Sequence, residues 1–118
     1  MLALLQEEPG ADLVEAALDH AQMSCVNVSE VLQKAEQHGI DTEGLEIDLE
    51  ALGVRLHAFD ISDARAAADL WLVTRSAGLS LGDRACLALA RKLGGVAVTT
   101  DKRWAELEEI DIPVETVR

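Results

Sequence analysis

Three acidic residues, Glu30, Asp83 and Asp101, lie where their carboxylates could act together. Glu30 and Asp101 each come shortly after a predicted strand, and Asp83 opens the helix that leads into the strand before Asp101. If these strands form a parallel sheet, their carboxyl ends share one edge, where open α/β sheets bind their ligands. The sequence therefore predicts that the three carboxylates converge at that edge.

A cluster of carboxylates needs a compensating charge. Two unit charges about 4 Å apart repel by on the order of 4 kcal/mol at an effective dielectric constant of about 20, so the cluster must bind either protons or a cation. Oxygen ligands without Cys or His favour Mg²⁺ or Mn²⁺. A cation of this kind activates water and stabilises charge on a phosphate, which suits hydrolysis of a phosphodiester bond.

The same residues also have a structural interpretation. Asp83 lies three residues after Ser80, and Glu30 three residues after Asn27, which is the spacing of a capping box at the start of a helix. Acidic residues in a first helical turn are also stabilised by the helix dipole. From spacing alone, we favour capping over catalysis for Glu30 and for Asp83, and we assign no chemistry to Asp63, which also begins a predicted helix.

Short apolar strands alternate with helices along the chain, which predicts an α/β fold with a parallel sheet. We expect strands at residues 23–26, 54–59, 96–99 and 112–117. We expect helices at residues 1–8, 11–21, 27–38, 43–52, 63–77, 81–93 and 101–107, with Asn27, Ser62 and Ser80 as N-caps. The 118 residues then form one domain.

Composition restricts the function classes. The net charge is −12, and residues 1–63 hold 14 acidic against 2 basic residues, so general binding to nucleic acid is disfavoured and a basic protein partner is favoured. No run of about 18 apolar residues could cross a membrane. Cys25 and Cys86 are isolated in apolar surroundings, and we expect two buried, reduced thiols in a cytoplasmic protein.

Two stretches carry a resemblance to a known family. Residues Gly78–Ala90 (GLSLGDRACLALA) and Val98–Trp104 (VTTDKRW) resemble the PIN-domain ribonucleases of the VapC toxin type. A third segment, Val26–Val31 (VNVSEV), is similar to the family's segment around a metal-binding Glu. The resemblance implies a three-layer α/β/α fold, in which a short parallel sheet is flanked by helices.

The resemblance also implies roles for residues and partners. Glu30, Asp83 and Asp101 would bind one or two divalent metals, Mg²⁺ or Mn²⁺, that activate water for RNA cleavage. The positions Asn27, Ser80 and Thr99 match polar residues beside these acids, although capping or hydrogen bonding at a strand end explains them equally well. Proteins of this type form homodimers, and a cognate antitoxin protein blocks them.

The family's first acid, an Asp at the end of its first strand, has no match here. Residues 1–10 are similar to the helix that follows that strand, so the first central strand is expected to be absent and the domain incomplete at its N-terminus. Three explanations are open: the start lies upstream, strands 23–26 and 96–99 pair directly, or a second copy fills the gap. The chain is then either a metal-dependent ribonuclease or a PIN-like binding module that does not cut RNA.

Overall fold

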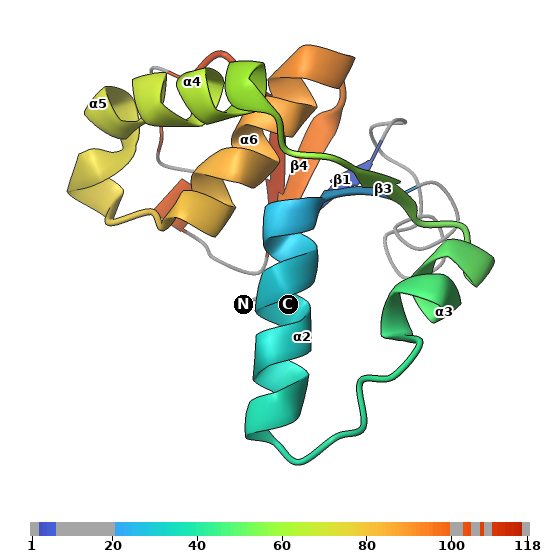
Figure 1. Cartoon of the computed structure of the whole chain (residues 1–118). Helices are drawn as coiled ribbons and strands as arrows, with labels where there is room; N and C mark the ends of the chain where they lie inside the picture. The colour runs from blue at the N-terminus through green and yellow to red at the C-terminus, as the bar shows by residue number, and fades with distance from the viewer. Residues whose placement is uncertain (1–2, 7–20, 100–102, 105–106, 108–109, 117–118) are drawn as a thin grey trace.

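The computed structural model describes residues 3–6, 21–99, 103–104, 107 and 110–116. These residues form a five-stranded sheet of order β3-β2-β1-β4-β5, with helices packed against it (Figure 1). The strands are β1 (Ala3–Gln6), β2 (Ala21–Ser24), β3 (Arg55–His57), β4 (Val96–Thr99) and β5 (Val114–Thr116). The helices are α2 (Cys25–Gln37), α3 (Leu45–Ala51), α4 (Ile61–Asp69), α5 (Trp71–Thr74) and α6 (Leu81–Leu93), with a 3-10 turn η1 (Arg75–Ala77).

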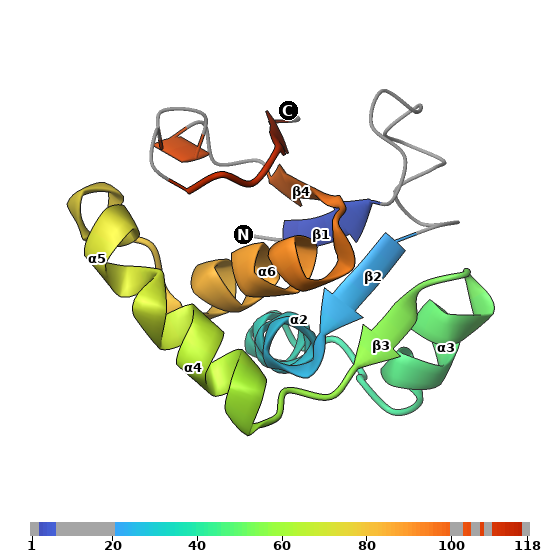
Figure 2. The same ribbon diagram turned by 90° about the horizontal axis from the view of Figure 1, so that it is seen from above.

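Four of the strands point the same way. Strand β2 is parallel to β3, and β4 is parallel to β5, while β1 is antiparallel to both β2 and β4. Because β2 and β4 both oppose β1, they run in the same direction, and their carboxyl ends meet at one edge of the sheet (Figure 2). The predicted parallel alignment of the two strands beside the acidic residues is therefore present.

Strand β1 corrects two expectations. Residues 3–6 form a strand and not part of a helix, and this strand occupies the central position that we expected to be empty. Its register with β4 pairs Ala3 with Thr99 and Gln6 with Val96. Strands β2 and β4 therefore do not pair directly, and this chain itself fills the gap between them. Leaving both strands with unpaired backbone groups in the interior would cost free energy, which β1 avoids.

Two hydrophobic clusters lie on opposite faces of the sheet. Ala97 packs in the cluster that includes Leu87 of α6, whereas its neighbour Val98 packs in the cluster that includes Met23, with Leu49 of α3 against it. Successive side chains of a strand point to opposite faces, so α6 and α3 pack on different sides of the sheet. The predicted fold class, an α/β fold with helices flanking short parallel strands, is confirmed.

The start of α2 differs from the prediction. The strand before it ends at Ser24, not at residue 26, and the Ser24 hydroxyl accepts a hydrogen bond of 3.2 Å from the Val26 N–H. Ser24 is therefore the N-cap, and the assignment of Asn27 as the cap was wrong. Asn27 is the third residue of the helix, and Glu30 lies in its second turn. Glu30 consequently takes no part in a capping box.

The start and end of α6 agree with the prediction. Ser80 is its N-cap, and Ser80 and Asp83 form a complete capping box. Gly94 ends the helix in the left-handed conformation, with φ of 67°, which glycine adopts without a steric penalty. Strand β4 follows at once, with all four residues buried.

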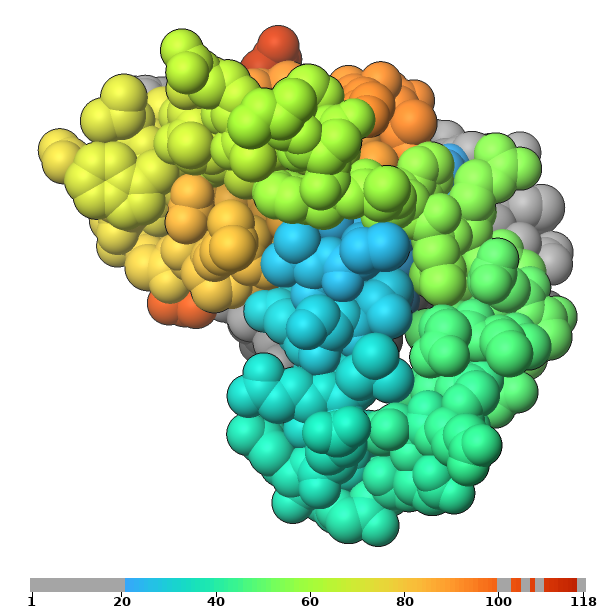
Figure 3. Space-filling view, viewed as in Figure 1, coloured from blue at the N-terminus to red at the C-terminus, as the bar shows by residue number. Residues whose placement is uncertain are grey.

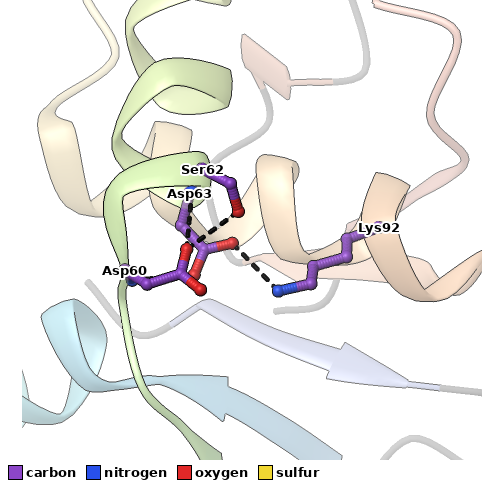
Figure 4. A network of polar contacts seen from close by, with 4 residues as sticks. All are labelled: Asp60, Ser62, Asp63 and Lys92. Carbon is purple, nitrogen blue, oxygen red and sulfur yellow. Dashed lines mark hydrogen bonds and ion pairs between the residues drawn. The ribbon is translucent and has the colours of Figure 1, made fainter.

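The start of α4 is capped by Asp60 and not by Ser62 (Figure 4). The Asp60 carboxylate accepts hydrogen bonds from the Asp63 N–H (3.0 Å) and from the Ser62 hydroxyl (2.8 Å). Lys92 near the end of α6 forms an ion pair of 3.3 Å with Asp63. This network ties the beginning of α4 to the end of α6.

The helix expected over residues 63–77 is divided at Leu70 into α4, α5 and η1. The Thr74 hydroxyl donates to the Leu70 carbonyl (2.8 Å), a local bond that often bends helices. Of the helix expected at 11–21, only Ala21 is described, and it begins β2 and not a helix. Most of the helix expected at 101–107 lies outside the described residues, although Trp104 is described and buried. No helix within the described ranges is long and apolar enough to cross a membrane.

The capping network of Asp60 predicts a dependence of stability on pH. The hydrogen bond from the Asp63 N–H, and then the one from the Ser62 hydroxyl, lower the pKa of Asp60 below its ordinary value. A lowered folded-state pKa means that Asp60 stabilises the fold at neutral pH and that this contribution disappears as the pH falls through the folded-state pKa. Urea unfolding between pH 7 and pH 2 should show this loss in the wild type and a smaller loss in Asp60→Asn.

The substitution Asp60→Asn keeps an N-cap oxygen, whereas Asp60→Ala removes it. At pH 7 we therefore expect Asp60→Ala to unfold at a lower urea concentration than Asp60→Asn. Glu50→Gln, on the exposed surface of α3, is the control for loss of a carboxylate alone. Identical pH profiles for the wild type and Asp60→Asn would contradict this account.

Candidate functional site

The first turns of α2 and α6 lie side by side (Figure 3), joined by the side chain of Asn27. Its amide nitrogen donates to the Gly82 carbonyl of α6 at 2.9 Å and to Oε1 of Glu30 at 3.1 Å. Asn27 is only 2% exposed. One buried amide thus fixes the distance between the two helices and orients the Glu30 carboxylate.

Glu30 and Asp83 are brought together by this contact. The Glu30 carboxylate lies directly against Gly82 and occupies the space that a Cβ at Gly82 would fill. Asp83 is the next residue and is buried, with 8% exposure. The Glu30 carboxylate therefore lies against the turn of α6 that carries Asp83.

The thiol of Cys86 lies near the negative charges of Asp83 and Glu30. The pKa of Cys86 is raised to about 12, chiefly because the thiol is buried and then because Asp83 and Glu30 both oppose a thiolate there. Cys86 is thus buried as expected, whereas Cys25 is exposed, which the sequence did not predict.

Asp83 has a structural role as well as a candidate chemical one. Its Oδ2 accepts from the Ser80 N–H at 3.0 Å, and the Ser80 hydroxyl accepts from the Asp83 N–H at 3.2 Å. The capping interpretation of Asp83 is therefore confirmed. The bond to Ser80 fixes the carboxylate and leaves Oδ1 outside the capping box.

Asn27 also presents a buried acceptor to this site. Its Oδ1 is shielded from solvent and has no hydrogen-bond partner. Exchanging the amide's nitrogen and oxygen would set Oδ1 against two other oxygens, of Gly82 and Glu30, so the donors fix the orientation. An unpaired buried carbonyl oxygen costs free energy unless something donates to it or binds it.

Of the other two predicted residues, only Thr99 is described, and it ends β4. Thr99 is fully buried at the carboxyl end of that strand, in register with Thr116 of β5. Asp101 lies outside the described residues. The structure therefore brings Asn27 and Glu30 to the first turn of α6, which Ser80 and Asp83 cap, and it places Thr99 at the end of β4; the third acid is not described.

The donors of this site fit a hard divalent cation. Within the described part of the chain, no three Asp, Glu, His or Cys side chains gather as a metal-binding group. The site does offer the carboxylates of Glu30 and Asp83 and the unpaired Oδ1 of Asn27. Mg²⁺ is usually held by one or two carboxylates and several waters, so this set of oxygens is compatible with it.

Sequence reasoning missed Gly82. A glycine inside a helix is less stable than alanine by roughly 1 kcal/mol, which was a signal that something else requires it. The requirement is the close approach of Glu30, a contact between residues far apart in the sequence. Spacing within one helix could not reveal it.

The chain has an α/β fold with acidic residues beside the carboxyl ends of its strands, which is where open α/β sheets bind their ligands. The family model for the PIN domain matches residues 1–110, and the chain belongs to the PIN domain family. Proteins of this family are generally nucleases, typically with divalent metals, and often toxins. Searches of curated proteins and of solved structures gave no significant match.

The contrast between the two cysteines gives a direct test of the site's burial. Because the pKa of Cys86 is about 12 and its side chain is buried, it should stay protonated and unreactive at pH 8. Exposed Cys25 should react. Titration with a thiol reagent should therefore modify one thiol per native chain and two in denaturant, and Cys25→Ser should reduce the native value to zero. Two reactive thiols in the native wild type would contradict the structure.

Proposed function

We propose that the chain is an endoribonuclease that depends on a divalent metal and hydrolyses RNA phosphodiester bonds, as the toxin of a VapBC-type toxin–antitoxin pair. The observation that carries the proposal is the approach of the Glu30 carboxylate from α2 to Gly82, in the first turn of α6, which also holds the buried Asp83. The motifs around these residues, and the family of the chain, favour nuclease chemistry over a purely structural role.

Each residue has a separate part in this proposal. Glu30 and Asp83 would hold Mg²⁺ or Mn²⁺, together with Asp101 from the segment after β4. A metal held there would polarise the phosphate and lower the pKa of a bound water. Asn27 orients Glu30, and Ser80 orients Asp83. Thr99, at the end of β4, is the second polar residue that we assign beside the acids.

An RNA substrate needs positive charge near the acids. The Arg103 guanidinium donates to the Ala77 carbonyl at 2.6 Å, just before the segment that leads into Ser80 and α6. Arg103 and Ser76 also line a polar surface hollow of about 250 Å³. A fixed guanidinium at this place could bind an RNA phosphate and offset the repulsion from an acidic chain.

Two protein partners belong to the proposal. A cognate antitoxin would present a basic segment to the carboxylates, since the chain carries a net charge of −12. A homodimer is supported by apolar side chains left exposed on α4 and α5, where Ile61 is 86% and Leu72 67% exposed. The exposed pair Arg65 and Asp69 on the same surface offers charges that a second copy could match.

A binding module without cleavage is the second candidate. Two observations favour it: the family's first acid has no match in the sequence, and Asp83 already has a structural function in its capping box. In that case the chain would bind an antitoxin or RNA through the same surface. Cleavage measurements separate the two functions.

The direct test is cleavage of a mixed structured RNA by the full chain with Mg²⁺ or Mn²⁺. We expect cleavage that a chelator abolishes and that falls by at least about 100-fold in Asp83→Asn and Glu30→Gln, because each substitution removes a charged metal ligand. Asp63→Asn is the matched control, since Asp63 also forms a capping box at a helix start but lies outside the site.

Loss of activity in Asp63→Asn equal to that in Asp83→Asn would show that capping, and not metal binding, explains the effect. A folded chain that cuts no RNA but binds an antitoxin tightly would favour the binding module. Cleavage that persists in chelator would contradict the proposed chemistry.

A further inference from the structure

We propose that Gly82 is a positioning residue. Because it has no side chain, it leaves the space in which the Glu30 carboxylate lies at the turn that carries Asp83. The inference rests on the proposed function, because it concerns how the metal-binding carboxylates are arranged. It assigns a role in the site to a residue that has no side chain of its own.

The backbone conformation does not explain the glycine. Gly82 lies in the first turn of α6 and is absent from the glycines with positive φ, unlike Gly78 and Gly94 on either side of the helix. Most residues could adopt its helical conformation. The need for glycine must therefore come from its surroundings.

The surroundings are the carboxylate of Glu30. The three heavy atoms nearest to a Cβ built at position 82 are Oε1, Oε2 and Cδ of Glu30, and all three would clash with it. These atoms form the end of a flexible side chain and not a rigid backbone. A methyl group at position 82 would therefore displace the carboxylate and leave the two helices in place.

The location also suits a negative charge. The Glu30 carboxylate reaches from α2 to the N-terminal turn of α6, where unpaired N–H groups and the helix dipole stabilise an anion. Asn27 donates both to Oε1 of Glu30 and to the carbonyl of Gly82. Residue 82 is thus contacted at its carbonyl by Asn27 and at its Cα by Glu30.

The substitution Gly82→Ala should separate stability from metal binding. It preserves the hydrogen bonds between Ser80 and Asp83 and the one from Asn27 to the carbonyl of residue 82, and alanine favours the helix. We expect a melting temperature equal to or above that of the wild type. Affinity for Mn²⁺, followed by electron paramagnetic resonance of the unbound ion, should fall by roughly 10- to 100-fold.

The mechanism is tested with Glu30→Ala and the double variant Gly82→Ala/Glu30→Ala. If Gly82 acts through Glu30, the double variant should bind Mn²⁺ no more weakly than Glu30→Ala alone. Leu81→Ala, at the neighbouring and half-exposed position of the same turn, is the matched control and should bind Mn²⁺ like the wild type. RNA cleavage should follow Mn²⁺ affinity across the set.

The melting temperatures of the wild type, the two single variants and the double variant, measured without metal, form a double-mutant cycle for stability. Gly82→Ala should raise the melting temperature of Glu30→Ala by more than it raises that of the wild type, because the clash between residue 82 and the Glu30 carboxylate is then absent. Unchanged Mn²⁺ affinity in Gly82→Ala, or an equal further loss in the Glu30→Ala background, would overturn the inference. A wild type that binds no Mn²⁺ would refute the proposed function, while coupling in the metal-free cycle would still support Gly82 as the residue that positions Glu30.

Discussion

The site depends on the buried amide of Asn27, which bridges two helices that are far apart in the sequence. Its two donated bonds, to the Gly82 carbonyl and to Glu30, fix both the approach of α2 to α6 and the orientation of a carboxylate. In a buried environment an unpaired amide or carbonyl is costly, so these bonds restrict the site to one arrangement. The local capping box with Ser80 fixes Asp83 in the turn of α6 that Glu30 approaches.

The sheet makes this arrangement possible. Strand β1 separates β2 from β4 and is antiparallel to both, so β2 and β4 run in the same direction and end at the same edge. Helix α2 begins directly after β2 without a loop, which places Asn27 and Glu30 close to that edge. Helix α6 contacts both β1 and β2 and presents its first turn to α2. Because the central strand β1 is antiparallel to both neighbours, β2 and β4 remain parallel to each other and their carboxyl ends lie at the same edge of the sheet.

Local signals in the sequence predicted α6 and β4 well. Ser80, Asp83 and Gly94 act within a few residues of their own positions, so their patterns define the helix without knowledge of the fold. The segment Ala3–Gln6 was predicted as a helix because a short run containing leucine fits either structure. Pairing with β2 and β4 decided the outcome, and that pairing is a long-range interaction.

The sequence marked acids at helix starts and strand ends, but it did not reveal the contacts between the helices. Asn27 was predicted as the cap before Glu30, whereas the structure shows that Ser24 caps the helix and that Asn27 makes the contact with α6. This shift removes the capping explanation for Glu30 while the one for Asp83 remains. The role of Gly82 depends on a contact between helices, so no pattern within α6 could have revealed it.

The central claim is that Glu30 and Asp83 form one cation site. The most direct measurement is an anomalous-difference map from crystals of the full chain soaked in Mn²⁺. We predict a peak between the first turns of α2 and α6, within direct or water-mediated reach of both carboxylates. An intact contact between Asn27 and Gly82 with no peak there at saturating Mn²⁺ would contradict the account, because the carboxylates would then serve only to stabilise the two helices.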